Sequence, residues 1–379
     1  MKKIIVAIDS FKGCMSSTEA VRAATEGIHR VWPSAQVLQI PVSDGGEGLL
    51  DSILTAKGGT IIHLLAHDPL MRLVPTRYGV LNDRQTAVIE MAEINGLTIL
   101  KADERNPMRT SSYGTGELIS DALKRGYRRI IIGLGGSATC DGGLGMLQAL
   151  GIQFYDCRGH QIGQGGQAMA TVATIRYDRM TPALQSAELI IACDVDNPFD
   201  GPQGAAYVFA PQKGASSEEV RLLDDGLHHL AGLIRLTTQT DLSTLPGAGA
   251  AGGIGGALAA FTRCSMQSGI DLFLDTVGFT GLLENTDLLI TGEGKADRQT
   301  LHGKVPMGIL KRGQAYHIPT LLITGAIDPD CIDELNAAGF RAVYSITPCP
   351  LSLEQAMDTT AAKKNLCHLL TQICRTINI

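Results

Sequence analysis

Short runs of aliphatic and β-branched residues recur along this chain, and Gly, Pro or Asp bounds each of them. Their length and continuous apolar character are typical of strands buried on both faces. The runs lie at residues 4–8, 37–41, 130–134, 189–192, 288–291, 320–324 and 342–346. Amphipathic segments with helical spacing, such as "STEAVRAATEGIHRVW", separate most of them. Buried strands that alternate with helices predict an α/β protein with a parallel sheet.

The pattern changes in the middle of the chain, and this change suggests two domains. Two strand–helix pairs at the start and three strands after about residue 275 predict a five-stranded, doubly wound sheet built from both chain ends. Residues 60–93 instead predict several longer strands joined by turns. We therefore expect a discontinuous domain, residues 1–60 and 276–379, and an inserted mixed α/β domain, residues 61–275.

Composition narrows the class of partner. The 379 residues carry a formal net charge of −6, so they offer no basic surplus to neutralise the phosphates of a nucleic acid. Aromatic residues make up only 4% of the chain, which leaves few platforms for stacking bases. Small anionic ligands remain compatible with this composition, because a single pocket can be positive on an acidic protein.

The number of cysteines and the length of the apolar runs indicate the cellular compartment that we expect for this protein. The nine cysteines are an odd number without a CxxC pair, which is typical of free thiols in a reducing cytoplasm. The apolar start "MKKIIVAIDS" is too short for a signal peptide, and no uncharged apolar run reaches the length of a transmembrane helix. We expect a cytoplasmic protein with no membrane partner, and leave self-association open.

Acidic residues follow five of the predicted strands. In open α/β sheets ligands bind beyond the carboxyl ends of the strands, so these positions are the informative ones. One such Asp is usually a helix cap, but five together are harder to explain in that way. The polar residues at these strand ends are Asp9, Ser10, Lys12, Asp44, Glu47, Ser137, Asp141, Asp194, Asn197, Glu293, Asp297 and Lys304.

Carboxylates that converge on one cleft repel one another and need a cation or a proton between them. Mg²⁺ is the hard cation that carboxylate and phosphate oxygens both bind. Lys12, Lys213 and Lys304 provide the positive charge that phosphates or a substrate carboxylate would need. The strand-end residues therefore point to a cleft for Mg²⁺ and an anionic, phosphate-bearing ligand.

The stretch "GLGGSATCDGG", residues 133–143, follows one of these strands. Gly135, Gly136 and Ser137 could offer successive backbone N–H groups to phosphate. "GLGGSA" is similar to the phosphate loop of the galactokinase–homoserine kinase family. A Walker A sequence is absent, and the Gly/Ala variant of the dinucleotide fingerprint stays open as an alternative. The Gly-rich residues 246–261 allow either a second anion nest or tight helix packing.

Taken together, the motifs resemble the type 1 glycerate kinase family. The matching stretches are "DSFKG" (9–13), "DGGEG" (44–48), "SSYGTGELISDAL" (111–123), "GLGGSATCDGGLGML" (133–147), "CDVDNPFDGPQGAAYVFAPQKGA" (193–215), "PGAGAAGGIGGAL" (246–258) and "TGEGKADRQTLHGKVPMG" (291–308). The resemblance runs from residue 9 to residue 308 in the order of the family. One departure is Cys140, which stands where the family usually has Asn.

The resemblance implies a kinase that uses ATP and Mg²⁺ to phosphorylate D-glycerate, giving 2-phosphoglycerate and ADP. It also implies a flavodoxin-like domain and an inserted domain with the active-site cleft between them. Phosphoryl transfer needs positioning, charge neutralisation and a proton acceptor. We expect Asp194 and Asp141 to bind the metal or accept the proton, with Lys12 as a further catalytic residue.

The other strand-end residues, together with Gly135, Gly136 and Lys213, are expected to bind substrate or nucleotide. Two other function classes stay open from the sequence. One is a nicotinamide-dependent hydroxy-acid oxidoreductase, although the first strand leads to "DSFKG" and lacks the Gly loop and later acidic residue of that class. The other is a non-catalytic sensor of a sugar acid.

Overall fold

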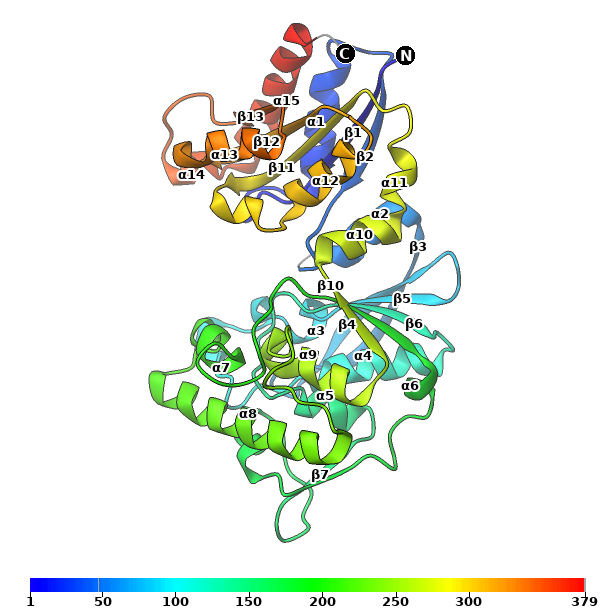
Figure 1. The fold of residues 1–379 in the computed structure, drawn as a ribbon, viewed down its shortest axis with the longest axis vertical. Coiled ribbons are helices and arrows are strands. Elements are labelled where there is room, and N and C mark those ends of the chain that lie inside the picture. The colour runs from blue at the N-terminus through cyan, green and yellow to red at the C-terminus, as the bar shows by residue number, and fades with distance from the viewer. Residues whose placement is uncertain (47, 378–379) are drawn as a thin grey trace. The chain divides into compact units, whose positions relative to one another are not determined.

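The computed structural model describes residues 1–46 and 48–377 (Figure 1). By its internal contacts the chain divides into two compact units. The outer unit comprises Met1–Asp44, Asp51–Lys57 and Ile270–Ile379, and the inserted unit comprises Gly45–Leu50 and Gly58–Gly269. Each unit has its own sheet and its own hydrophobic core.

A five-stranded parallel sheet forms the centre of the outer unit. Its strands are β1 (Lys3–Ile8), β2 (Gln36–Pro41), β11 (Leu288–Ala296), β12 (Thr320–Ile327) and β13 (Ala342–Ser345), in the spatial order β13-β12-β11-β1-β2. Numbered within this sheet alone, that order is 2-1-3-4-5, the flavodoxin-like order. The predicted doubly wound sheet built from both chain ends is therefore confirmed.

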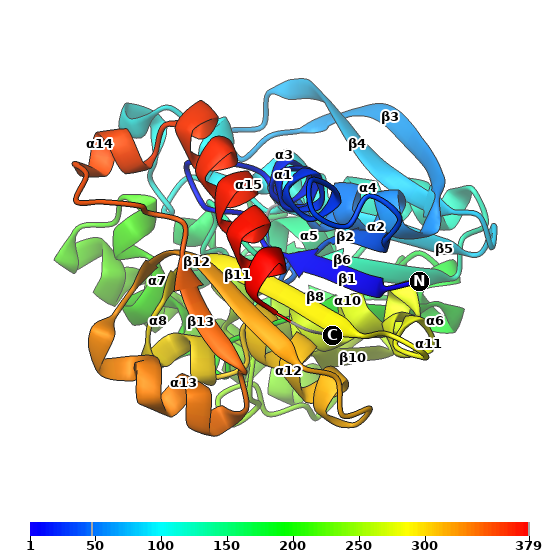
Figure 2. The same ribbon diagram turned by 90° about the horizontal axis from the view of Figure 1, so that it is seen from above.

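Helices cover both faces of this sheet. On one face α1 (Ser17–His29) and α15 (Thr359–Thr376) pack against β1, β11 and β12, and Figure 2 shows these two helices from above. On the other face lie α12 (Val305–Gln314) and α13 (Ile332–Ala338). The remaining elements of this unit are α2 (Leu49–Lys57), α10 (Gly269–Val277), α11 (Phe279–Leu282), η5 (Arg298–Leu301), η6 (Pro329–Cys331) and α14 (Leu353–Ala356). The first residues of α2 and α10 belong to the inserted unit.

The sequence explains why α1 and α15 lie so close together. Ser16 caps α1 and forms a capping box with Glu19, so the helix begins at Ser17. At Gly27 the backbone of α15 comes so near that an added Cβ would lie 2.3 Å from the carbonyl oxygen of Cys367. Only glycine permits that approach, and Thr371 donates a hydrogen bond to the Gly27 carbonyl across the contact.

The inserted unit contains a six-stranded mixed sheet, as the longer strands in the middle of the sequence predict. Its spatial order is β10 (Cys264–Gln267), β9 (Glu188–Ala192), β6 (Arg129–Gly133), β5 (Thr86–Glu90), β4 (Leu73–Leu81) and β3 (Gly59–His67). The first four strands of this series pair in parallel, and β4 and β3 extend the sheet antiparallel. β7 (Gln153–Tyr155) and β8 (Thr174–Arg176) form a separate two-stranded sheet.

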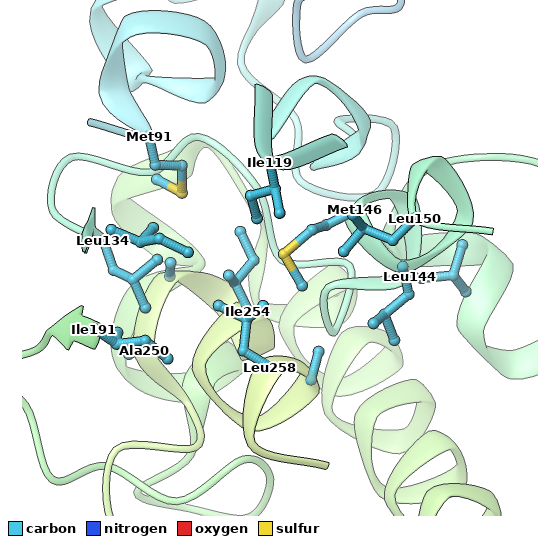
Figure 3. Close-up of a cluster of buried hydrophobic side chains, with 14 of the residues drawn as sticks. Met91, Ile119, Leu134, Leu144, Met146, Leu150, Ile191, Ala250, Ile254 and Leu258 are labelled. Carbon is cyan, nitrogen blue, oxygen red and sulfur yellow. The ribbon is translucent and has the colours of Figure 1, made fainter. Parts of the chain in front are cut away.

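Side chains from the central strands and several helices form the core of the inserted unit, and Figure 3 shows the part of it contributed by β9 and three of the helices. The helices are α4 (Tyr113–Lys124), α5 (Leu144–Ala149) and α9 (Ala250–Phe261), and they contribute residues such as Ile119, Met146 and Ile254. The other helical elements are α3 (Ala92–Asn95), η1 (Leu97–Ile99), η2 (Ala102–Glu104), η3 (Gly166–Thr171), α6 (Ala183–Ser186), α7 (Ala205–Phe209), η4 (Pro211–Lys213) and α8 (Ser217–Thr238).

The Gly-rich residues 246–261 serve tight packing, which was one of the two alternatives that the sequence left open. Ala251, Gly252 and Gly253 have left-handed backbone conformations, and they bend the start of α9. An added Cβ at Gly252 would lie 2.1 Å from the carbonyl oxygen of Thr139, so no larger residue fits there. Residues 250–253 therefore pack directly against the backbone of Thr139 and Cys140.

Candidate active site

The loop from Gly133 to Gly143, called the glycine loop below, joins β6 to α5 and is anchored at both ends. Leu134 and Leu144 are buried in the core of the inserted unit (Figure 3). Between them the backbone turns through positive φ angles, 73° at Gly136 and 62° at Gly142. Such angles strain residues that have a Cβ, so these glycines fix the course of the loop.

Only a short part of the glycine loop is accessible. Gly135 and Gly136 are the only residues of the loop that are not buried, and Ser137 beside them is 9% exposed. Further along, the amides of Ala138 and Gly142 donate to backbone carbonyls of neighbouring segments, each at 2.9 Å. Those amides are not offered to a ligand. The predicted anion-binding role therefore falls on Gly135, Gly136 and Ser137, where it stays a prediction.

The carboxylate of Asp141 is fully buried and holds the loop to two helix starts. One oxygen accepts from the Ser112 backbone N–H at 2.8 Å, from the Ser112 hydroxyl at 2.9 Å and from the Gly145 N–H at 3.2 Å. The other accepts from the Gly143 N–H at 3.1 Å. Burial raises the pKa of Asp141, and these four hydrogen bonds act against that rise. The geometry disfavours Asp141 as a metal ligand or base, because protein donors already occupy its oxygens.

Lys213 lies beneath the same loop and is 2% exposed. Its ammonium donates to the Ser137 hydroxyl oxygen at 2.6 Å and to the Thr139 carbonyl oxygen at 2.7 Å. Burial lowers the pKa of Lys213 to about 8, and the nearby Cys140 and Asp141 act in the opposite direction. The structure thus brings Lys213 and Ser137 together by a direct hydrogen bond between their side chains.

Cys140 does not lie on the accessible side of the loop. Its side chain is 0% exposed and belongs to the apolar core of the inserted unit. Burial raises the pKa of the thiol to about 12, so it stays protonated at neutral pH. A residue that faces the core cannot bind a ligand directly, whatever its position in the motif.

Asp194 and Asn197 follow β9, as the sequence predicts. Asp194 is exposed, and one of its carboxylate oxygens accepts from the Gly269 N–H at 2.8 Å. The amide side chain of Asn197 donates to the Gln203 carbonyl at 2.8 Å, and its own backbone carbonyl accepts from the Gly249 N–H at 2.9 Å. Asn197 thus shapes the loop after β9, whereas Asp194 presents a carboxylate at its surface.

In the outer unit the parallel register of β1 and β11 brings two predicted carboxylates together. Ile8 pairs with Gly292 in the parallel register, so Asp9 and Glu293, the next residue of each strand, come side by side. The Asp9 N–H continues the ladder by donating to the Gly292 carbonyl at 2.9 Å. β1 is also where the sheet order reverses, the place at which open α/β sheets bind their ligands.

Asp9 holds its proton far more firmly than an ordinary carboxyl group. Its pKa is raised to about 7, chiefly by burial and next by repulsion from the Asp44 carboxylate. The Ser10 N–H, which donates to Asp9 at 2.6 Å, and the charge of Lys12 act against the rise. A carboxyl group with this pKa is half ionised near neutrality, so it can both take up and release a proton there.

Glu293 is held by a small network of side chains. It is 7% exposed and accepts from the Thr300 hydroxyl at 2.5 Å, while the Lys304 ammonium lies 3.7 Å from its other oxygen. Lys304 also lies 3.9 Å from Asp297, which caps η5. Burial raises the pKa of Glu293, and Thr300 and Lys304 act against that rise. Lys304 is therefore shared between two carboxylates.

Each of the two units contains one group of the predicted residues. Each group is drawn from one unit, and Glu47 lies outside the described residues. The outer unit brings together Asp9, Ser10, Lys12, Asp44, Glu293, Asp297 and Lys304. The inserted unit brings together Gly135, Gly136, Ser137, Asp141 and Lys213, with Asp194 and Asn197 on the loop after β9.

Sequence reasoning missed two residues that hold these groups. Ser112 bonds Asp141 through both its backbone and its hydroxyl, and Thr300 bonds Glu293. Both lie in stretches that match the family, "SSYGTGELISDAL" and "TGEGKADRQTLHGKVPMG". The presence of these hydroxyl residues within the family motifs could have marked them as candidates. The sequence does not show which carboxylate each hydroxyl bonds.

Two features are absent from the described residues. Residues 1–46 and 48–377 contain no cluster of three or more His, Cys, Asp or Glu side chains arranged to hold a metal ion. Within the same residues, no helix combines the length and apolar character needed to cross a membrane.

Known proteins similar to this chain match it over nearly its full length. The model of the Glycerate kinase family matches residues 4–378. A glycerate kinase of Bacillus subtilis (strain 168) is 43% identical over 359 residues, covering 95% of this chain and 94% of the relative. The glycerate 2-kinase of Escherichia coli (strain K12) is 40% identical over 377 residues, covering 100% and 98%.

A solved structure agrees with both the fold and the family. It is a crystal structure from Salmonella typhimurium LT2 of a protein described as glycerate kinase 2, with a TM-score of 0.88 and 40% sequence identity. The match covers 99% of this chain and 98% of the solved one. The family resemblance of the sequence motifs is confirmed, and the chain belongs to the glycerate kinase family, whose members are enzymes.

Proposed function

We propose that this enzyme transfers the terminal phosphoryl group of ATP to D-glycerate and forms 2-phosphoglycerate and ADP, with Mg²⁺ as the metal. The observation that carries the proposal is the family match over residues 4–378. The choice of the 2-hydroxyl is supported by the relative from Escherichia coli, which is a glycerate 2-kinase and aligns with 100% of this chain.

Asp194 is our candidate magnesium ligand. Mg²⁺ keeps several waters and is usually held by one or two carboxylates together with substrate phosphates. Asp194 presents an exposed carboxylate on the loop after β9, which suits that kind of site. When bound, Mg²⁺ would neutralise charge on the phosphates and orient them for transfer.

Asp9 is our candidate for the group that accepts the hydroxyl proton of glycerate. It follows the strand at which the sheet order reverses, and its pKa is raised to about 7 by burial and by Asp44. A base works best when its pKa lies near the working pH. Lys12 and Lys304 supply positive charge in the same unit, which suits a substrate carboxylate or phosphate oxygens.

On the inserted unit, Gly135, Gly136 and Ser137 are our candidate contacts to phosphate or carboxylate oxygens. They form the only stretch of the glycine loop that is not deeply buried. For Asp141 we propose a positioning role in place of the metal or base role that the sequence suggests. It fixes the loop by bonding Ser112, Gly143 and Gly145, and so positions the accessible stretch.

The test is to incubate the purified protein with ATP, Mg²⁺ and D-glycerate and to measure ADP release. We expect ADP release that depends on glycerate, and phosphorus NMR of the product should identify 2-phosphoglycerate. A 3-phosphoglycerate product would overturn the assigned hydroxyl alone. No glycerate-dependent ADP release would overturn the proposed reaction, and tight NAD(H) binding or ligand binding without turnover would then favour the oxidoreductase or sensor alternative.

A further inference from the structure

Lys213 is a buried cation that pairs with neutral groups. Its ammonium bonds a hydroxyl and a backbone carbonyl, Ser137 Oγ at 2.6 Å and Thr139 O at 2.7 Å. Among the described residues it forms no ion pair with a carboxylate, although it is only 2% exposed. Burying a charge without a counter-ion is costly, so this arrangement is a poor one for stability alone.

A second feature of the same loop also costs stability. The hydroxyl oxygen of Thr139 is buried and has no hydrogen-bond partner within residues 1–46 and 48–377. Buried polar groups without partners are rare in native proteins, and they are frequent at functional sites. A cation without an ion pair therefore contacts the glycine loop at Ser137 and Thr139, and the unsatisfied hydroxyl belongs to the same Thr139.

The bond from Lys213 decides what the Ser137 hydroxyl can do. Because Ser137 Oγ accepts from an ammonium that has no lone pair, its own proton must point elsewhere. No acceptor for that proton lies among the described residues. A hydroxyl that accepts from a cation also becomes a stronger donor. Ser137 adjoins Gly135 and Gly136, which are the accessible part of the loop.

We propose that Lys213 is a positioning residue, which holds the Ser137 hydroxyl so that its proton is donated outward to an anionic oxygen of a bound ligand. The inference rests on the proposed function, because it takes the anionic oxygen to belong to glycerate or to ATP. Lys213 itself stays under the loop and does not touch either ligand. This differs from the sequence expectation, in which Lys213 binds phosphate directly.

Loss of the charge of Lys213 would reverse this hydrogen bond. Burial lowers the pKa of Lys213 to about 8, and the groups that face it are Cys140 and Asp141, on the glycine loop itself. A neutral amine has a lone pair and can accept the Ser137 proton. The outward donor would then be lost as pH rises through about 8, while the loop keeps its fold.

The experiment is a double-mutant cycle on the full chain with Ser137→Ala, Lys213→Met and the double variant. ADP release is measured while glycerate and ATP are varied separately. If Lys213 acts through Ser137, each single variant raises the KM of the same substrate by about 10-fold or more, and the double variant adds little to the larger single effect. The substrate affected shows whether glycerate or ATP supplies the anionic oxygen.

Lys124→Met is the matched control, because Lys124 is exposed at the end of α4 and should leave both KM values unchanged. Independent effects that add in the double variant would overturn the proposal. An effect of Lys213→Met without any effect of Ser137→Ala would overturn it as well. Thermal unfolding of each variant separates a lost fold from a lost contact.

If Lys213→Met does not fold, the pH dependence of the wild type and of Ser137→Ala decides the matter. The KM of the affected substrate should rise above a pH of about 8 in the wild type and stay flat in Ser137→Ala. A wild-type KM that is flat across this range would contradict the proposal. If the wild type shows no kinase activity, the proposed reaction fails. Calorimetric measurement of ATP and D-glycerate binding then tests the role of Lys213, which predicts weaker binding of one ligand in each single variant and little further loss in the double variant.

Discussion

Ser112 donates two hydrogen bonds to one carboxylate oxygen of Asp141, from its backbone N–H at 2.8 Å and from its hydroxyl at 2.9 Å. The Ser112 hydroxyl oxygen in turn accepts from the Met146 N–H at 3.0 Å. Ser112 precedes α4 and Met146 lies in the first turn of α5, so one buried carboxylate joins two helix starts. Negative charge is favoured at both, because helix starts carry partial positive charge.

Asp141→Asn should therefore damage the fold of the loop. The amide replaces one acceptor oxygen by a donor that faces N–H groups, and at least one buried partner is left unsatisfied. We expect the free energy of unfolding to fall by about 3 kcal/mol, measured by urea denaturation. Asp225→Asn is the control, because Asp225 is exposed on α8. Unchanged stability with activity abolished would instead restore Asp141 as a catalytic group.

The sequence predicts the architecture better than it predicts the roles of single residues. Strand burial is a local signal, so apolar runs such as residues 288–291 and 320–324 indicate the strands correctly. The closeness of Asp9 and Glu293, each one residue beyond the Ile8–Gly292 pair, also follows from the parallel pairing of the two strands. The strand positions follow from the apolar pattern of the sequence, and the neighbouring strand ends follow from the parallel topology.

Roles that depend on distant contacts were beyond that reasoning. Lys213 and Ser137 are 76 positions apart, and nothing in the sequence says that they bond each other and not a ligand. Asp141 follows a Gly-rich stretch just as a metal ligand would, yet its carboxylate points at Ser112. The direction of a side chain in an irregular loop depends on the segments packed around it, which a single sequence does not reveal.

The pKa of Asp9 gives a prediction for the pH dependence of turnover. As a base, Asp9 is active when ionised, so kcat/KM should fall as pH drops through about 7. Removing the Asp44 charge by Asp44→Asn takes away repulsion that raises this pKa. The acidic limb of the pH–rate profile should then shift to lower pH, whatever the change in absolute rate.

Two further variants sharpen this test. Asp9→Asn should lower kcat by about 100-fold or more, since a positioned base typically contributes that factor. Glu284→Gln, at an exposed carboxylate of the same unit, should leave the profile in place. An acidic limb that does not move in Asp44→Asn would show that another group is the base.

Cys140 stands where the resemblance led us to expect Asn, and its burial gives a substitution there a physical consequence. Cys140→Asn would put an amide into an apolar core where no partner is arranged for it. We expect a loss of about 2 kcal/mol in the free energy of unfolding, with the KM of either substrate unchanged if the fold survives. Cys140→Ala removes only a small buried group and should cost less.

Thiol labelling checks the burial of Cys140 directly. In the native protein a maleimide should react with the exposed Cys157 and Cys349 and leave Cys140 unmodified until the protein is unfolded, as read by mass spectrometry of peptides. Rapid native labelling of Cys140, or a lower glycerate KM in Cys140→Asn, would contradict the view that this side chain faces the core.

Asp200 links three segments of the inserted unit and predicts a pH-dependent contribution to stability. It is nearly buried and accepts from the Ser243 hydroxyl at 2.6 Å, while its other oxygen lies 2.6 Å from Nδ1 of His228. The hydrogen bond to Asp200 raises the pKa of His228 above its usual 6.5. The pair therefore binds a proton more tightly in the folded chain than in the unfolded one.

A raised pKa of this kind stabilises the fold fully below about pH 6, and the gain is lost as pH rises through the folded-state pKa. His228 is largely exposed, so solvent screening limits the gain to under about 1 kcal/mol. His228→Gln should lower the free energy of unfolding at a pH of about 5.5 but hardly at about 8.5, whereas His63→Gln, at an exposed position of β3, should show no such difference. Urea unfolding at the two pH values measures this, and an equal effect of His228→Gln at both would mean that its contribution is packing and not charge.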